Sequence, residues 1–347
     1  MPTTRHRALI SFFAWANLLA QIGIITTGGA VRLTGSGLGC STWPNCEPGQ
    51  FTPEFRAATS LHPFIEFGNR TLAGVVLACA LGLFLLLWAA HRRRLTPGRS
   101  TTLIGLAAAI VLIVIGQAVL GGMTVWFELH PALVGSHFGI SGILVTLSTY
   151  LLLRWREGDG EPRLPDITNR NALRPLAWAL GVLAAAVVVI GVIVTGAGPH
   201  SGDADVGYRF DVDPLTMARV HAGLAWAFSA AVVTLLVVLL RARPLPGGQL
   251  GAAQPVLAAP SGTGGAETAV AAPTAHSAPS ATRAGHELRR ARRRAVVLAG
   301  VTLAQGAIGY VQYFTGLPEL IVGFHLFGAA VLIAAVTAAI MALRVRD

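Results

Sequence analysis

The sequence predicts an all-α integral membrane protein with eight transmembrane helices arranged as two pseudo-repeated four-helix bundles. Of its 347 residues, 53% are hydrophobic and only 12% are charged, which is about half the charged fraction of a soluble domain. The chain contains eight apolar runs, each long enough to cross a bilayer. Two stretches of the chain also repeat each other, and this repeat predicts that the helices form two related halves.

The apolar runs set the order of the predicted helices. They lie at roughly 9–31, 66–90, 102–124, 133–153, 173–195, 217–240, 295–315 and 320–343. A soluble helical protein would show amphipathic stripes instead of continuous apolar runs. The first run has no small-residue cleavage site after it, so we interpret it as a retained helix and not as a signal peptide.

These runs divide into two halves separated by one unusual segment. Residues 1–160 form the predicted N-terminal half, and residues 161–241 and 286–347 form the predicted C-terminal half. The intervening residues 242–285 are rich in Ala, Pro, Gly, Ser and Thr and have almost no large apolar groups. This composition predicts a disordered cytoplasmic linker, because it cannot build a packed core.

The basic residues are distributed asymmetrically along the chain. All 26 are arginine, and 21 of them lie in loops or at helix ends on one side of the predicted bundle. The positive-inside rule places this side, with both termini, in the cytoplasm of a bacterial cell. Basic loops at this position meet anionic lipid. The net charge of +10 therefore indicates a multi-pass protein of the cell membrane whose partner is the lipid bilayer, and it argues against nucleic-acid binding.

The internal repeat is centred on a histidine in each half. Gln117 and His137 are twenty residues apart, as are Gln305 and His325. The residues that match between them are Gly121 and Gly309, Leu129 and Leu317, Val134 and Val322, and Gly135 and Gly323. An imidazole at membrane depth is costly without a partner, so a functional role is the first hypothesis for both histidines.

Three histidines lie at matched depth, within one or two turns of the outer ends of their predicted helices: His137, His221 and His325. A single example would be explained by an interhelical hydrogen bond, whereas three favour metal ligation. His221 and His325 lie on partner helices of the C-terminal half and are predicted to supply both axial ligands of one haem. The sequence contains no CxxCH motif, so any haem would be held noncovalently.

The N-terminal half differs at one of these positions, because Asn69 stands where the C-terminal half has His221. Asparagine is a poor haem ligand, so His137 would face an open side, where a substrate can react. Glu66 lies one helical turn from Asn69. We predict that Glu66 assists proton or radical chemistry there, and Glu66, His137 and Asn69 form the predicted catalytic set.

Each of these predictions has an alternative. Glu66 could instead form a structural ion pair with Arg70 or Arg32. His62, just before the helix of Asn69, is either an alternative ligand on the open side or a surface histidine.

Three of the few arginines on the outer side lie beside the predicted site helices: Arg32, Arg70 and Arg219. A guanidinium group matches a haem propionate bidentately, so these residues are candidates for cofactor binding. The alternative is that their side chains extend to the membrane interface.

Two of the three cysteines lie in the outer loop 32–65. Outside the cytoplasm, Cys40 and Cys46 can form a disulfide across a short turn that contains proline. The alternatives are two free thiols or a metal site, for which only His62 is nearby. The role of a disulfide, structural or redox-active, stays open.

Taken together, these motifs resemble one membrane-enzyme family, the haem A synthases. They are residues 28–40 (GGAVRLTGSGLGC), 43–46 (WPNC), 66–70 (EFGNR) and 117–125 (QAVLGGMTV), together with the three histidines. The resemblance covers nearly the whole chain except the linker. It implies a haem b held by His221 and His325, and a substrate, haem O, bound near His137 and Glu66.

The resemblance also implies a reaction and partners. A methyl group of haem O is oxidised to a formyl group through successive hydroxylations and loss of water, and the product haem A goes to cytochrome c oxidase. The extracellular cysteine pair of the family maps onto Cys40 and Cys46 and helps haem transfer from haem O synthase. The electron donor stays unknown, and a homo-oligomer is an open expectation.

One departure from the family bears on the site: the family commonly has a histidine where this chain has Asn69. Two other functions are kept as alternatives. A b-type cytochrome that carries electrons from quinol would have closed haems in both halves, which Asn69 argues against. A transporter would have broken helices and a polar pathway, whereas the predicted spans contain little charge.

Overall fold

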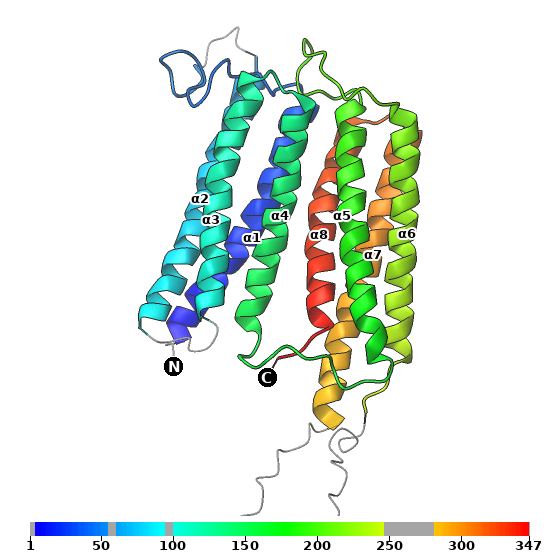
Figure 1. Cartoon of the computed structure of the whole chain (residues 1–347). Coiled ribbons are helices and arrows are strands. Elements are labelled where there is room, and N and C mark those ends of the chain that lie inside the picture. The colour runs from blue at the N-terminus through cyan, green and yellow to red at the C-terminus, as the bar shows by residue number, and fades with distance from the viewer. Residues whose placement is uncertain (1–3, 55–59, 94–99, 246–280, 347) are drawn as a thin grey trace, which may run out of the picture.

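The computed structural model describes residues 4–54, 60–93, 100–245 and 281–346. Within these ranges, eight helices are long and apolar enough to cross a membrane. They stand side by side, with the N- and C-terminal ends of the chain at the same end of the bundle (Figure 1). The predicted all-α, multi-pass membrane fold is confirmed.

The helices follow the apolar runs closely. Their bounds are α1 (Thr4–Leu33), α2 (His62–Arg92), α3 (Ser100–Trp126), α4 (Pro131–Arg156), α5 (Leu173–Ala197), α6 (Pro214–Arg241), α7 (Ala281–Phe314) and α8 (Glu319–Ala342). A short 3₁₀ helix, η1 (Arg170–Ala172), precedes α5. The predicted linker, 242–285, falls mainly on residues 246–280, which lie outside the described residues.

The start of α7 differs from the prediction, because this helix begins at Ala281 and not near residue 295. Its first turns are too polar for a hydropathy signal, but they carry an amphipathic stripe. The stripe consists of Ala284, Leu288, Ala291, Ala295 and Leu298, all at most 3% exposed. Since these residues recur every three or four positions, they form one buried face of a helix that extends beyond its apolar segment.

The eight helices pack as two groups of four. In the N-terminal half, α1 packs on α2, α2 on α3, α3 on α4, and α4 back on α1. The C-terminal half repeats this order with α5 to α8, and the halves meet where α8 contacts α1 and α4 and where α4 contacts α5 (Figure 1). This packing confirms the prediction of two four-helix bundles.

Each half has its own packed interior. Leu83, Leu103 and Leu151 are among the buried residues of the first half, and Leu235 and Leu298 are among those of the second. Large apolar side chains also point outward, as Trp178 (76% exposed) and Leu303 (77% exposed) show. In a membrane protein such side chains face lipid, so the helices associate through close packing rather than by escaping water.

The repeat extends to the backbone of the α3–α4 and α7–α8 connections. Leu129 and Leu317 adopt left-handed conformations with φ of 59° and 62°. The amide of Leu129 donates to the carbonyl of Thr124 at 2.7 Å, and the amide of Leu317 donates to the carbonyl of Gln312 at 2.8 Å. Non-glycine residues rarely adopt this conformation, so its recurrence at matched positions shows that the two halves share one architecture.

Gly316, in the connection between α7 and α8, allows a test of whether this turn requires a left-handed backbone conformation. It has a φ of +81°, and an added Cβ atom would meet nothing within 4 Å. We therefore expect Gly316→Ala to lower the free energy of unfolding by roughly 1 kcal/mol through backbone strain alone. The control Gly300→Ala places an alanine inside α7, also in open space, and should not destabilise the protein. Denaturation in detergent micelles measures both variants, and an equal loss in the two would contradict the prediction.

Candidate functional site

Two histidines of the C-terminal half face each other between α6 and α8. The ring centroids of His221 and His325 are 6.4 Å apart, and the ring planes are inclined by 69°. Nδ1 of His221 is buried without a hydrogen-bond partner among the described residues, although the backbone of Val187 on α5 interacts with the ring. The structure thus brings together the two side chains that the sequence predicts as a ligand pair.

Neighbouring helices make room for both imidazole rings, and one of them also bonds to His325. Nε2 of Gln305 on α7 donates to the backbone carbonyl of His325 at 2.8 Å and lies 3.1 Å from its Nδ1. Glycines leave space for the rings: a Cβ atom added to Gly309 would lie 3.3 Å from Cε1 of His325, and one added to Gly191 would lie 3.0 Å from Cε1 of His221. Sequence reasoning missed Gly191, since it lies outside the two Gln-to-His segments on which the repeat was recognised.

The N-terminal half repeats this arrangement around His137 on α4. Nε2 of Gln117 donates to the backbone carbonyl of His137 at 2.8 Å, and a Cβ atom added to Gly121 would lie 3.5 Å from its Cε1. The amide of Gln117 also donates to the hydroxyl of Ser141 at 2.7 Å. Nδ1 of His137 is buried without a hydrogen-bond partner among the described residues. The position that matches Ser141 in the second half is Ala329. Only the first half therefore has a hydroxyl group that accepts from the glutamine amide.

Asn69 is held by α1. The hydroxyl of Thr27 donates to Oδ1 of Asn69 at 2.7 Å. Helices α1 and α5 occupy equivalent places in the two halves, and both contain a Thr-Gly pair, at 27–28 and at 195–196. When the two sequences are aligned on these pairs, Gly23 matches Gly191. A Cβ atom added to Gly23 would meet nothing within 4 Å, whereas one added to Gly191 would crowd His221. The N-terminal half therefore has open space where the C-terminal half has its second imidazole.

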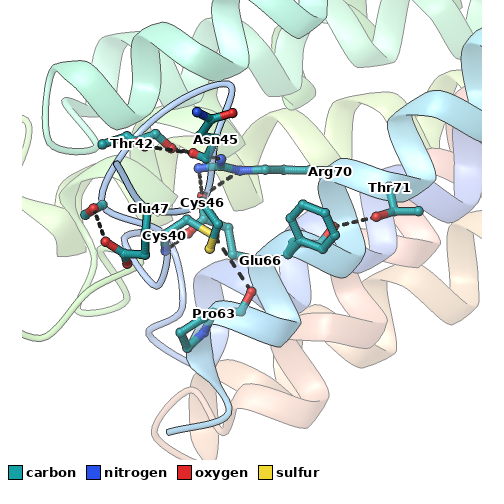
Figure 2. Close-up of a disulfide and its surroundings, with 11 residues drawn as sticks. Cys40, Thr42, Asn45, Cys46, Glu47, Pro63, Glu66, Arg70 and Thr71 are labelled. Carbon is teal, nitrogen blue, oxygen red and sulfur yellow. Dashed lines mark hydrogen bonds and ion pairs between the residues drawn. A yellow bond between two sulfur atoms is a disulfide. The ribbon is translucent and has the colours of Figure 1, made fainter. Parts of the chain in front are cut away.

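Glu66 connects α2 to the outer cysteine loop (Figure 2). It is only 5% exposed, and its Oε2 accepts a hydrogen bond from the backbone amide of Cys40 at 2.7 Å. Its Oε1 forms an ion pair with Nη2 of Arg70 at 2.5 Å. Nη1 of Arg70 donates to the loop carbonyls of Thr42 at 2.9 Å and Asn45 at 3.1 Å. Glu66 and Arg70 thus hold the loop on the end of α2.

The cysteine loop contains the predicted disulfide between Cys40 and Cys46, whose sulfur atoms are bonded and buried (Figure 2). This bond replaces the alternatives of free thiols and a metal site. His62 is exposed, and its Nδ1 lies 2.8 Å from the hydroxyl of Ser36. Across the described ranges, no group of three or more His, Cys, Asp or Glu side chains could hold a metal ion.

The remaining predicted residues lie in different settings. Arg32 ties the end of α1 to the second half, because Nε donates to the carbonyl of His200 at 2.7 Å and Nη2 to that of Thr195 at 2.9 Å. Arg219 is exposed near the start of α6. Arg32 thus contributes to the outer contact between the halves, which the sequence did not indicate.

Fold and site together define a multi-pass membrane protein built from a duplicated bundle that buries imidazole groups in both halves. Over residues 11–201, more than half of its length, the chain matches the COX15-CtaA family, described as "Cytochrome oxidase assembly protein". The chain belongs to this family, as its motifs predicted.

Several curated relatives carry the name "Heme A synthase". The chain is 31% identical over 191 residues to the protein of Halalkalibacterium halodurans, a match that covers 54% of this chain and 60% of the relative. It is 33% identical over 154 residues to that of Lysinibacillus sphaericus, covering 43% and 45%. It is 37% identical over 133 residues to that of Bacillus pumilus, covering 38% and 39%. The matched part thus spans 60% of the first relative's length and less than half of the other two.

The ion pair of Glu66 and Arg70 makes a prediction about stability. Arg70→Met leaves a buried carboxylate without its cation, so we expect the free energy of unfolding to fall by roughly 3 kcal/mol. The double variant Glu66→Gln/Arg70→Met should be more stable than Arg70→Met alone, because its amide carries no charge. Denaturation followed by tryptophan fluorescence measures the free energy of unfolding of these variants and of Glu66→Gln. If the loss in the double variant equals the sum of the losses in the two single variants, Glu66 and Arg70 are not coupled.

Proposed function

We propose that this chain is a haem A synthase, a membrane haem-dependent oxidoreductase that converts a methyl group of haem O to the formyl group of haem A for cytochrome c oxidase. The single observation that carries the proposal is the His221–His325 pair, whose rings face each other at 6.4 Å. Family membership and relatives named "Heme A synthase" give the pair its chemical context.

His221 and His325 would hold a haem b between them. Their ring separation of 6.4 Å leaves room for one metal ion bonded to each imidazole at about 2 Å. No third His, Cys, Asp or Glu side chain joins them among the described residues, so a porphyrin, which brings its own nitrogen ligands, suits the pair better than a bare ion. When bound, haem b supplies a redox-active iron that transfers electrons.

The N-terminal half offers a site for the substrate. His137 presents a buried imidazole whose Nδ1 has no hydrogen-bond partner in the described part of the chain, and it would position haem O. Asn69 would line the open side, because it bonds to Thr27, which lies one helical turn from the free space at Gly23. The long isoprenoid tail of haem O can extend into lipid, which suits a site between membrane helices.

Glu66 would assist the oxidation from the outer end of this half. It lies one turn from Asn69 on α2, so both side chains project from the same side of the helix. The hydrogen bond from Cys40 and the ion pair with Arg70 fix its carboxylate. In this proposal the disulfide loop receives haem O from haem O synthase, and its attachment to Glu66 couples delivery to the site.

The orientation of the chain is part of the proposal. The loop between α1 and α2, which carries the disulfide, lies at one end of the bundle, and both termini lie at the other (Figure 1). The arginine-rich end would face the cytoplasm, which places the disulfide loop on the oxidising side of the cell membrane. Arg219, which is exposed, would then serve a haem propionate at the outer end, whereas the guanidinium groups of Arg32 and Arg70 already hold backbone carbonyls and Glu66.

Haem analysis tests the proposed reaction. In cells that make haem O, we expect the purified protein to contain haem B together with haem O or haem A. Glu66→Gln should keep haem B but lower haem A formation on the order of 100-fold, the usual contribution of a positioned acid or base. Extraction and mass analysis measure each haem. The control Glu47→Gln changes a carboxylate of the cysteine loop. Among its described contacts, this carboxylate accepts a hydrogen bond only from the hydroxyl of Ser41.

Two results would contradict the proposal. Normal haem A levels in Glu66→Gln would remove its role in the reaction. Haem B alone in the wild-type protein would favour the b-type cytochrome that carries electrons from quinol.

The cofactor pair has its own test. His325→Ala should abolish the low-spin absorption spectrum of bound haem b, because one axial ligand is lost. Gly191→Ala should weaken haem retention, since its Cβ atom would lie 3.0 Å from the His221 ring. The control Gly181→Ala, on the same helix, adds only an ordinary contact at 3.8 Å. An unchanged spectrum in His325→Ala would show that the ligand assignment is wrong.

A further inference from the structure

A cationic pocket lies between the C-terminal end of α4 and the first turns of α7. The histidines, in contrast, lie near the N-terminal ends of α4, α6 and α8. The volume of the pocket is about 420 Å³, and the pocket is lined by Leu153, Arg156, His286, Arg289, Arg290, Arg293 and Arg294. The two helices belong to different halves, and the C-terminal end of α4 and the N-terminal end of α7 lie at the end of the bundle where both termini are found (Figure 1). We refer to it as the arginine pocket.

The arginine pocket carries charge without a counter-charge. Five guanidinium groups line it, and no carboxylate does. Nearby arginines on the same side are neutralised, since Arg163 pairs with Glu287, and Arg344 with Glu157. Within the described ranges, no ion pair links the five pocket arginines to an acid. Guanidinium groups gathered so closely repel one another, so the pocket favours an anion.

The fold of α7 gathers these charges. Arg289 and Arg293 are four residues apart, as are Arg290 and Arg294, so they share one side of the helix. The buried stripe from Ala284 to Leu298 fixes the rotation of α7. Arg292 points elsewhere and donates to carbonyl groups at the end of α6. The pocket therefore follows from helix geometry and not from an unstructured basic segment.

The surroundings place the arginine pocket at the depth of lipid headgroups. Leu153 gives it an apolar wall, and the guanidinium group of Arg156 stands over the ring of Trp15 at 5.6 Å. Arg92 stands over Trp88 at 5.5 Å in the same manner. Tryptophan is enriched at membrane interfaces, and the apolar segment of α7 begins directly after Arg294.

We propose that the arginine pocket binds the headgroup of an anionic phospholipid that carries two phosphate groups. Guanidinium groups bind phosphate oxygens bidentately, and basic pockets between membrane helices on this side are suited to such headgroups. Five cations from two helices match two phosphates better than one. The bound lipid would bridge α4 and α7 and so stabilise the contact between the halves.

Lipid titration of the delipidated full-length protein tests this proposal. Cardiolipin, phosphatidylcholine and inorganic phosphate are added separately in detergent, and native mass spectrometry and the thermal midpoint are recorded. We expect retained cardiolipin adducts and a raised midpoint, with no such effect of phosphatidylcholine. Arg289→Gln/Arg293→Gln should weaken cardiolipin binding about 30-fold, because each surface arginine contributes roughly 1 kcal/mol.

Control variants separate binding from folding. Arg92→Gln/Arg93→Gln removes two arginines of the same side but outside the pocket, and should bind cardiolipin as the wild type does. Arg289→Lys/Arg293→Lys keeps the charge and should retain most of the affinity. Equal cardiolipin binding by the wild type and the glutamine variant would overturn the proposal. Stabilisation by inorganic phosphate at the same phosphate concentration would also overturn it, since the ligand would then be a soluble anion.

Discussion

A polar side chain at membrane depth must find its hydrogen-bond partners within the protein, and the site depends on how this requirement is met. Gln117 and Gln305 each cross to the next helix and donate to a histidine backbone carbonyl at 2.8 Å. These two bonds fix the relative positions of α3 with α4 and of α7 with α8. The Nε2 atoms of both glutamines find partners in this way, whereas their Oε1 atoms are buried without a hydrogen-bond partner among the described residues.

Small differences between the halves explain why two imidazoles lie together in the C-terminal half, whereas the N-terminal half has one imidazole beside open space. Ser141 accepts from the amide of Gln117, whereas Ala329 at the matched position cannot, and Gln305 instead approaches the ring of His325. Asn69 is shorter than histidine and is bonded to Thr27. Duplication of one scaffold, followed by changes in a few polar contacts, thus gives two chemically different sites.

The sequence predicts the fold well because helix position in a membrane follows hydropathy, and the repeat identifies the histidines. The averaged hydropathy of the sequence does not predict the first turns of α7, because arginines lower it there, although apolar residues at every third or fourth position form an amphipathic face. The sequence also gives no indication that Arg32 bonds the carbonyls of His200 and Thr195, or that Glu66 accepts from the amide of Cys40. These contacts depend on how outer loops fold back on helix ends, which periodicity does not encode.

The two halves are joined differently at the two ends of the bundle. At the outer end the amide of Gly37 donates to the carbonyl of Gly202 at 2.7 Å, and Arg32 adds two bonds between the halves. At the other end α4 and α7 present like charges to one pocket, where an anion is proposed to bind. All three histidines lie near the first turns of helices that begin at the outer end. The proposed anion would therefore act at the end of the bundle remote from the histidines, whose surroundings depend on the direct bonds at the outer end.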